Sequence, residues 1–323
     1  MNLILADKKI TLVYKQSRLT YAQEKGLPSE LKNLCDEHDA ITQELTTSHE
    51  NNLRCIDYIS SVLDNLGLSY ELICRSDIRP QDLENRLVIS IGGDGTVLET
   101  SHKCLDAPIL GVNSDPKHSI GALCIATQDN FREILEQIYS GLLLPSPIMR
   151  LAIRHQESLQ KTLALNDILY CHQNPAAMSR FSISTKNAHE VHRASGIWIA
   201  SAAGSTGGIF SAGGIAYPIE HQRASFRVRE PYWSDAQPPA LLAGSFGLGE
   251  EVTLRSNMTD ARIYIDGPHI YLDIPLGDSV SISIADNPLW LFNAERLNKQ
   301  RDRLILPRLS FRKLLRDGEE DRA

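Results

Sequence analysis

The first half of the chain alternates short apolar runs with segments in which apolar residues recur at helical spacing. Helical spacing is found over residues 53–66 and 131–138, so one face of each segment is apolar. Four apolar or β-branched runs predict strands at residues 10–14, 69–74, 87–91 and 109–112. The third run is uninterrupted, which is typical of a strand buried on both faces. Strands that alternate with helices predict an α/β domain with a doubly wound, mostly parallel sheet over residues 1–145.

Local signals predict the ends of the helices in this domain. Thr47 and Glu50 have the spacing of a T-x-x-E capping box, which predicts a helix start there. Asp129 is the expected N-cap of the second helix, and Gly141 is its expected stop. The polar stretch 15–46 shows no periodicity that assigns it to a strand or a helix.

Beyond residue 145 the pattern changes to that of β-structure. Short alternating or β-branched stretches predict strands at residues 151–154, 163–170, 181–184, 196–201, 252–255, 262–265, 270–274 and 280–285. The pair Asp266-Gly267 between two of these stretches predicts a hairpin turn. We therefore expect a mostly β second domain over residues 146–293 and a helical tail with a charged, solvated surface over 294–323.

Composition and charge exclude several classes of partner. The 323 residues include 33 Lys and Arg against 40 Asp and Glu, for a net charge of −7. Proteins that bind nucleic-acid phosphates usually carry the opposite balance, and anionic membranes repel this charge, so neither partner is expected. No apolar run approaches the ~18 residues that a membrane span requires. The six cysteines are scattered without a CxxC pair, which predicts reduced thiols in a cytoplasmic protein and no zinc site.

The clearest chemical signal is the string Gly92-Gly93-Asp94-Gly95-Thr96, which directly follows the third predicted strand. The glycines allow backbone N–H groups to approach phosphate oxygens at the start of a helix expected near Thr96. A carboxylate repels phosphates, but it is useful where it faces a hydroxyl nucleophile or a metal that bridges the phosphates. The string is neither a Walker A motif nor G-x-G-x-x-G. It therefore indicates phosphoryl transfer, whereas a lone Asp-Gly pair would indicate only a turn.

Two further constellations carry polar side chains next to predicted strands. Asn166 and Asp167 are adjacent, so both reach one ligand only near a strand end or a bulge. A simple polar turn is the alternative. Residues 203–206 follow an apolar strand, and there small residues allow a close approach while Ser205 and Thr206 supply hydroxyl groups. A flexible Gly/Ser linker is the alternative for that segment.

In this order and spacing, the three motifs resemble the NAD kinase family over roughly residues 85–290. Strings at 111–116, 165–169, 178–181, 201–206 and 228–231 are similar to the plant-type NADH kinase branch. The resemblance implies an N-terminal α/β domain, a C-terminal β domain and a nucleotide site in the cleft between them. It implies transfer of the γ-phosphoryl group of ATP, with Mg²⁺ or another divalent cation, to the 2′-hydroxyl of the adenosine ribose of NADH or NAD. It also implies a homo-oligomer, with a dimer favoured.

The same resemblance implies roles for individual residues. Asp94 is the expected catalytic acid/base. The expected substrate-binding residues are Gly92, Gly93, Gly95, Thr96, Asn113, Asn166, Asp167, Ser195, Ala203, Gly204, Ser205 and Thr206. Ser195 and Gly208 stand where many NAD kinases have Asp and Tyr, towards the nicotinamide half of the ligand, so we expect a shift in selectivity towards NADH. No protein metal ligands are expected, because phosphates and water would hold most of the Mg²⁺ coordination sphere.

Two other functions share parts of this pattern. Diacylglycerol and sphingosine kinases have a similar Gly-Gly-Asp-Gly-Thr loop, and a dinucleotide sensor without catalytic activity would keep the binding motifs. The pair Asn166-Asp167, the segment 203–206 and the lack of a membrane-binding feature are evidence against a lipid kinase. The retained Asp94 is evidence against a sensor.

Overall fold

The computed structural model describes residues 8–16, 40–155, 161–234, 238–292 and 294–320. The chain divides into two compact units, each of which is described by itself. Unit 1 is Met1–Ser146 with Leu289–Leu297, and unit 2 is Pro147–Pro288 with Asn298–Ala323.

The sheet of unit 1 has the strand order β2-β1-β3-β4-β19-β6, and β5 pairs with β4. The β1–β2, β1–β3, β3–β4, β4–β5 and β4–β19 pairs are parallel, which confirms the expected α/β class. The strands are β1 (Lys9–Tyr14), β2 (Tyr70–Cys74), β3 (Arg86–Gly92), β4 (Ile109–Asn113), β5 (Ala126–Thr127), β6 (Pro145–Ile148) and β19 (Leu289–Phe292). All residues of β3 after Arg86 are buried, as its uninterrupted apolar run predicts.

This sheet is contacted by the helices α3 (Ala40–Asn65), α4 (Asp94–Ser101) and α5 (Phe131–Tyr139). Two short 3₁₀ helices, η2 (Arg75–Asp77) and η3 (Pro80–Asp82), follow β2. The capping box expected at Thr47 and Glu50 is wrong, because both residues lie inside α3. Residues three apart on a helix are surface neighbours, so a T-x-x-E pair also fits a helix interior.

The expected N-cap of α5 is also wrong. Asn130, not Asp129, precedes the helix, and its side chain accepts the N–H of Thr127 (2.7 Å) instead of capping the helix. Gly141 lies just beyond the end of the helix with a φ of 74°, a conformation that favours glycine. Asn and Asp both suit an N-cap, so the sequence alone does not separate the two neighbours.

The apolar segment Leu289–Phe292 returns to the sheet of unit 1 as strand β19, where Leu291 pairs with Ile109. The sequence interpretation placed this segment in the second domain, because it directly follows the β-rich region. Leu289, Leu291 and Phe292 are buried, so the burial of an apolar run accounts for its return.

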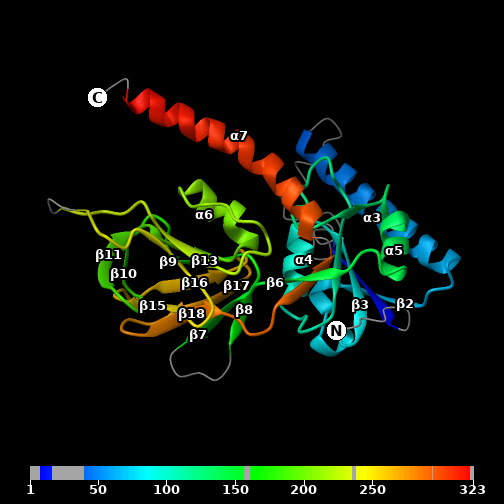
Figure 1. The fold of residues 1–323 in the computed structure, drawn as a ribbon, viewed down its shortest axis with the longest axis horizontal. Coiled ribbons are helices and arrows are strands. Elements are labelled where there is room, and N and C mark those ends of the chain that lie inside the picture. The colour runs from blue at the N-terminus through cyan, green and yellow to red at the C-terminus, as the bar shows by residue number, and fades with distance from the viewer. Residues whose placement is uncertain (1–7, 17–39, 156–160, 235–237, 293, 321–323) are drawn as a thin grey trace. The chain divides into compact units, whose positions relative to one another are not determined.

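Unit 2 contains two six-stranded sheets whose paired strands are antiparallel (Figure 1). The first has the order β11-β10-β15-β18-β7-β8 and the second has the order β14-β13-β12-β9-β16-β17. Apolar side chains of both sheets form one core, for example Ile153 of β7 and Ile199 of β12. The first sheet consists of β7 (Leu151–His155), β8 (Thr162–Ala164), β10 (Ser179–Ser184), β11 (His189–Ala194), β15 (Glu251–Ser256) and β18 (Ser279–Ile284). The second consists of β9 (Asp167–His172), β12 (Gly196–Ala200), β13 (Ala224–Arg229), β14 (Ala243–Phe246), β16 (Ala261–Ile265) and β17 (Ile270–Ile274). The mostly β second half is thereby confirmed.

The hairpin predicted at Asp266-Gly267 is confirmed, since β16 and β17 pair across it. The single strand expected over 163–170 is wrong, because β8 ends at Ala164 and β9 begins at Asp167. The strands β11, β13 and β14 were not predicted. Strand β11 has only two apolar residues and β14 has four residues in all, whereas β13 (ASFRVR) does alternate and was missed.

Three helical segments complete unit 2: η4 (Ala203–Thr206), α6 (Gly208–Ser211) and the greater part of α7 (Ala294–Glu320). Helix α7 confirms that the tail is helical. Its Arg301 is only 2% exposed, whereas we expected the charged residues of the tail to be exposed to solvent. Within the described ranges, no helix is both long and apolar enough to cross a bilayer.

Candidate active site

The glycine-rich string lies where strand β3 passes into helix α4. Strand β3 ends at Gly92 and α4 begins at Asp94, two residues earlier than expected. A Cβ on Gly92 would clash with the Thr96 hydroxyl, and one on Gly93 would lie 2.7 Å from the Ser119 hydroxyl. The Thr96 side chain thus occupies the space that a side chain at Gly92 would need, whereas a side chain at Gly93 would require the Ser119 hydroxyl to move. The buried Thr96 hydroxyl has no hydrogen-bond partner within the described part of the chain.

The carboxylate of Asp94 is held by the backbone that follows strand β4. Its oxygens accept the N–H groups of Ala122 (2.9 Å) and Leu123 (2.7 Å). Burial raises the pKa of Asp94 above its ordinary value, and these two hydrogen bonds offset part of the increase. A carboxylate has about four lone-pair sites, so Asp94 can accept a further proton donor while it keeps both backbone contacts.

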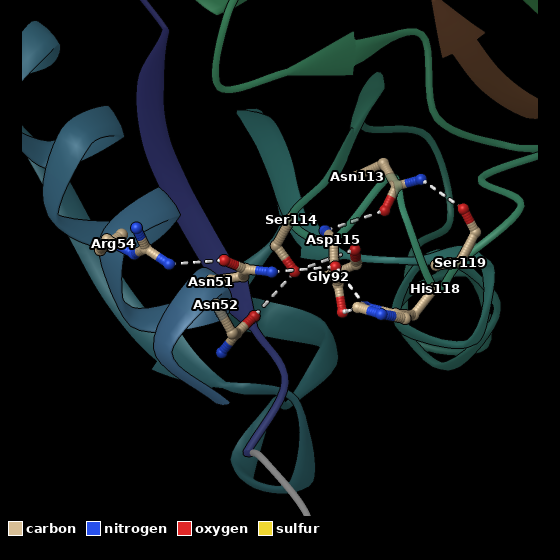
Figure 2. A network of polar contacts seen from close by, with 9 residues as sticks. All are labelled: Asn51, Asn52, Arg54, Gly92, Asn113, Ser114, Asp115, His118 and Ser119. Atoms are coloured by element: carbon tan, nitrogen blue, oxygen red, sulfur yellow. Dashed lines mark hydrogen bonds and ion pairs between the residues drawn. The ribbon is translucent and has the colours of Figure 1, made fainter. Parts of the chain in front are cut away.

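A polar network lies next to this loop, at the carboxyl ends of β3 and β4 (Figure 2). The Ser114 hydroxyl lies 3.0 Å from the Asn52 side-chain oxygen and 3.2 Å from the Gly92 carbonyl. Asp115 accepts a hydrogen bond from Asn51 (3.0 Å) and lies 3.0 Å from Nδ1 of His118. Burial of Asp115 raises its pKa, but the hydrogen bonds, first that of His118, outweigh this effect and lower the pKa overall.

Asn113 belongs to the same network, and its amide is used within the protein. Its side-chain oxygen accepts the N–H of Asp115 (3.1 Å), and its amide nitrogen donates to the Ser119 carbonyl (3.0 Å) (Figure 2). Asn113 is 5% exposed. In this structure it therefore shapes the turn that follows β4.

Two cationic side chains that the sequence interpretation did not select lie beside the glycine-rich string. Cδ of Lys15, just after β1, is 3.4 Å from a Cβ placed on Gly92, and Nη1 of Arg75 is 3.8 Å from a Cβ placed on Gly95. Arg75 also pairs with Glu99 of α4 (2.9 Å). Both cations follow neighbouring parallel strands, whose carboxyl ends meet at one edge of the sheet. That placement is the signal that could have identified them.

In unit 2, Asp266 organises the turn that carries Asn166 and Asp167. Its carboxylate accepts three successive backbone N–H groups, from Leu165 (2.7 Å), Asn166 (2.7 Å) and Asp167 (3.0 Å). The N–H of Asp266 donates to the Asp167 carbonyl (2.9 Å). Strand β9 begins at Asp167, so the pair lies at a strand end, where adjacent side chains can serve one ligand.

Asp167 has the most strongly perturbed acidity of the candidate residues. Burial raises its pKa from 3.8 to about 7, and the nearby charge of Asp266 contributes to the increase. Desolvation and a like charge both favour the neutral carboxyl. Perturbed carboxyls of this kind are common at functional sites.

The segment 203–206 lies against this turn. A Cβ on Gly204 would overlap the backbone of Asn166, and one on Gly207 would lie 3.2 Å from a carboxylate oxygen of Asp167. The N–H of Ser201 donates to the Asn166 carbonyl (2.9 Å). The structure thus brings together two motifs that are more than 30 residues apart in the sequence.

The two hydroxyl residues of this segment differ in their surroundings. Ser205 is fully buried, and its hydroxyl donates to the Ala202 carbonyl (2.8 Å) and accepts the N–H of Tyr217 (2.8 Å). It therefore supports the loop from inside. Thr206 is half-buried, as is the adjacent Gly207. Ala203 and Gly204 are buried within the 3₁₀ helix η4.

Ser195 is not brought to this cluster. It precedes β12, whose other end pairs Ala200 with Asp167. At about 3.3 Å per strand residue, the five residues of β12 place Ser195 about 16 Å from the strand end that pairs with Asp167. Gly208, the other departure from the family pattern, lies against the indole of Trp198, which a Cβ on Gly208 would approach to 2.7 Å. Within the described ranges, no cluster of three or more His, Cys, Asp or Glu side chains could hold a metal ion.

Comparisons with known proteins agree with the motifs. Residues 7–143 match the ATP-NAD kinase N-terminal domain. The chain is 35% identical to a probable NADH kinase of Oryza sativa subsp. japonica over 268 residues, which cover 76% of this chain and 82% of that protein. It is 32% identical to the NADH kinase of Arabidopsis thaliana over 286 residues, which cover 81% of this chain and 90% of that protein.

Two solved structures share the fold. The crystal structure of an NAD kinase from Archaeoglobus fulgidus in complex with ATP has a TM-score of 0.67 at 20% identity, covering 92% of this chain and 99% of that chain. The crystal structure of yeast NADH kinase complexed with NADH has a TM-score of 0.64 at 16% identity, covering 94% and 88%. From the motifs, the fold and the extent of the two plant similarities, we conclude that the chain belongs to the NAD kinase family.

Proposed function

We propose that this chain is an NAD(H) kinase, which transfers the γ-phosphoryl group of ATP to the 2′-hydroxyl of the adenosine ribose of NADH or NAD. The observation that carries the proposal is the Gly92–Thr96 string between a buried parallel strand and a helix, in a chain 32–35% identical to plant NADH kinases over most of its length. Mg²⁺ or a similar cation enters as part of the ATP substrate, because phosphate oxygens and water are its preferred ligands.

Asp94 is the residue that acts on the acceptor hydroxyl in this proposal. A ribose hydroxyl is a poor nucleophile at neutral pH, so a carboxylate that orients it and accepts its proton accelerates the transfer. The backbone N–H groups of Ala122 and Leu123 fix the Asp94 carboxylate in one orientation. Preorganisation of this kind removes the entropic cost of aligning the base during the reaction.

The phosphates of ATP bind at the start of helix α4, to the backbone of Gly92, Gly93 and Gly95. The glycines lie in a close-packed turn, and the N-terminus of the helix that follows favours negative charge. The Thr96 hydroxyl, which has no hydrogen-bond partner among the described residues, is buried beside this loop. This hydroxyl supports the proposal, because a phosphate bound to the loop would supply the acceptor that it lacks among those residues.

The dinucleotide binds in unit 2, to Asn166, Asp167 and the segment 203–206. Asp266 holds the first two at a strand end, and the glycine backbone of 204 and 207 lies directly beside them. Thr206 is the hydroxyl of this segment that faces a ligand in our proposal, since that of Ser205 is used inside the loop.

A titration of the purified protein with NADH, followed by addition of ATP, tests this function against the alternatives. The proposal predicts heat of binding with NADH and formation of NADPH once ATP is added. Binding without NADPH would identify a dinucleotide sensor. Phosphorylation of diacylglycerol or sphingosine without binding of NADH would identify a lipid kinase.

Lys15 provides a prediction about ATP. Its half-buried side chain runs beside Gly92, where a cation stabilises bound phosphate, and a charge-assisted hydrogen bond contributes about 1.5–3 kcal/mol. The variant Lys15→Met is expected to raise the KM for ATP about tenfold and to leave the KM for NADH nearly unchanged. Lys103→Met, at an exposed position after α4, is the control. Equal KM values for ATP in the two variants would remove Lys15 from the phosphate site.

Ser195 provides a prediction about the oxidation state of the dinucleotide. A carboxylate about 5–6 Å from the positive nicotinamide ring would favour NAD⁺ by roughly 3 kcal/mol at an effective dielectric of ~20, and solvent reduces this to about 1 kcal/mol. The wild type is therefore expected to accept NADH at least as well as NAD⁺, and Ser195→Asp to shift kcat/KM about fivefold towards NAD⁺. A strong wild-type preference for NAD⁺, or no shift in the variant, would contradict the role of Ser195.

We also propose that the protein is a cytoplasmic homodimer, in keeping with its family, its scattered free thiols and its net charge of −7. Light scattering on the purified chain tests the oligomeric state directly, with twice the mass of 36.0 kDa as the expected result.

A further inference from the structure

Arg301 of helix α7 is buried in unit 2. Arg301 is 2% exposed, whereas the neighbouring Asp302 and Arg303 are exposed. Burial lowers the pKa of Arg301 to about 10, although the charges of Glu220 and Asp302 act against this shift. A buried guanidinium is costly unless its donors are satisfied, so the contacts of Arg301 indicate what the helix gains from it.

Those contacts converge on the loop proposed to bind the dinucleotide. Nη1 of Arg301 donates to the Ala203 carbonyl (2.6 Å), and Nη2 donates to the Ala202 carbonyl (2.6 Å), the Ser205 hydroxyl (3.0 Å) and the Tyr217 carbonyl (3.0 Å). Its Nε has no partner within the described part of the chain. Four acceptors from two separate segments are thus gathered on one planar group, a geometry that lysine cannot reproduce from a single ammonium.

Two further residues of α7 continue the contact along the helix. The side chain of Asn298 accepts the N–H of Ile219 (2.8 Å) and donates to Glu220 (2.7 Å). Arg308 donates to the Thr206 carbonyl (2.7 Å). Residues 298, 301 and 308 have the spacing of one helix face. This face therefore holds the loop at both ends of the 3₁₀ helix η4 and also holds the segment that follows α6.

We propose that Arg301 is a positioning residue for the dinucleotide site. Through Arg301, the C-terminal helix becomes part of that site. The inference rests on the proposed NAD(H) kinase function, since it assigns the dinucleotide to the segment 203–206. Arg301 fixes the carbonyls of Ala202 and Ala203 on the inner side of the loop. The fixed loop keeps Gly204 against Asn166, so the two dinucleotide motifs stay in one arrangement.

Dissociation constants for NADH and steady-state constants in matched variants test the proposal. Arg301→Lys keeps the charge and loses the planar fork, while Arg301→Gln loses both. Each is expected to raise the Kd and KM for NADH about tenfold, with the KM for ATP and the kcat changed less than twofold. Arg303→Gln, on the same helix at an exposed position, is expected to match the wild type. In Arg301→Ala, guanidinium at tens of millimolar is expected to lower the KM for NADH again, which a general loss of stability would not allow.

Arg308→Gln covers the case in which every Arg301 variant fails to fold. Arg308 is exposed and contributes one contact to the loop, so its loss is expected to raise the Kd for NADH about twofold to threefold in a folded protein. Unchanged NADH affinity in the folded Arg301 variants, or in Arg308→Gln if those variants do not fold, would overturn the proposal. A wild type that binds NADH without phosphorylating it would refute the kinase function, while the Kd values would still decide the role of Arg301. A wild type that binds neither NADH nor NAD⁺ would refute both.

Discussion

Replacing Asp94 with Asn is expected to lower kcat for NADPH formation by at least about 100-fold, because the acceptor hydroxyl loses its general base. The affinity for NADH should change little, since the residues proposed to bind it belong to the other unit. The measurement is steady-state kinetics of the variant with saturating ATP and NADH. Turnover near the wild-type value would remove Asp94 from the mechanism.

The same substitution is expected to cost stability. Both oxygens of Asp94 accept backbone N–H groups, from Ala122 and Leu123, and an Asn would place its NH₂ group against one of them. An unsatisfied buried donor typically costs about 1–3 kcal/mol. Thermal unfolding of the variant therefore has to accompany the kinetics, and kcat is corrected for the folded fraction. Asp106→Asn, at an exposed position beyond α4, is the control for both measurements.

The pH dependence of the wild type gives an independent check on Asp94. Burial raises its pKa, and a general base must be deprotonated to act. As the pH falls, kcat is thus expected to decrease with a midpoint above about 3.9, which is the pKa of an ordinary aspartate. This acid limb should be absent from the residual activity of Asp94→Asn. An unchanged limb in the variant would assign it to another group.

Asp167→Asn is expected to weaken dinucleotide binding and to stabilise the fold, in a pH-dependent way. The pKa of Asp167 is about 7 in the folded chain against an ordinary 3.8. Below the pKa of the unfolded chain, the carboxyl of Asp167 is neutral in both the folded and the unfolded state and does not change the free energy of unfolding. As the pH rises towards 7, the unfolded state ionises while the folded state resists, so the folded state loses stability. Above pH 7 the full cost remains.

The stabilising effect should be visible at pH 8 and absent at pH 4. Each pKa unit corresponds to 1.36 kcal/mol. Asp167 is only half-buried, however, so water screens much of the free-energy cost of its charge. We expect a gain of about 1–2 kcal/mol at pH 8, or a few degrees in Tm. The KM for NADH should rise about 5- to 150-fold, as expected for the loss of a ligand partner worth about 1–3 kcal/mol.

Asn166→Ala is the matched variant for this experiment. It should raise the KM for NADH similarly, with the KM for ATP less affected, but it removes no buried carboxyl and should give no pH-dependent gain in stability. A KM for NADH that is unchanged in both variants would return the pair to the role of a structural turn. Equal stability of Asp167→Asn and wild type at pH 8 would show that Asp167 is not held at a raised pKa.

Elements with a strong local pattern could be predicted from the sequence. The uninterrupted run before Gly92 gave a buried strand, and Asp266-Gly267 gave a hairpin, because each depends on neighbours in the chain. Strand β19 could not be assigned to its sheet from its own sequence. Its place in unit 1 depends on pairing with β4, about 180 residues earlier in the sequence.

The candidate site shows the same division. The motifs identified the loop of Asp94 and the pair Asn166-Asp167, but not what holds them. The N–H groups that bind Asp94 come from a turn 28 residues away, and the carboxylate that binds the backbone of Asn166 comes from residue 266. Arg301 lies in a segment whose mixed charges resemble an ordinary solvated helix. Such contacts depend on tertiary structure, and a single sequence contains no local signal for them.

The most direct test of the kinase function is to incubate the purified chain with NADH, ATP and Mg²⁺, to separate the dinucleotide products and to locate the new phosphate by ³¹P and ¹H NMR. The NAD(H) kinase function predicts ATP-dependent formation of NADPH, with the phosphate on the 2′-oxygen of the adenosine ribose and a rate at least about 100-fold lower in Asp94→Asn. Absence of NADPH from a folded wild type that binds both substrates, or a phosphate at another position, would contradict it.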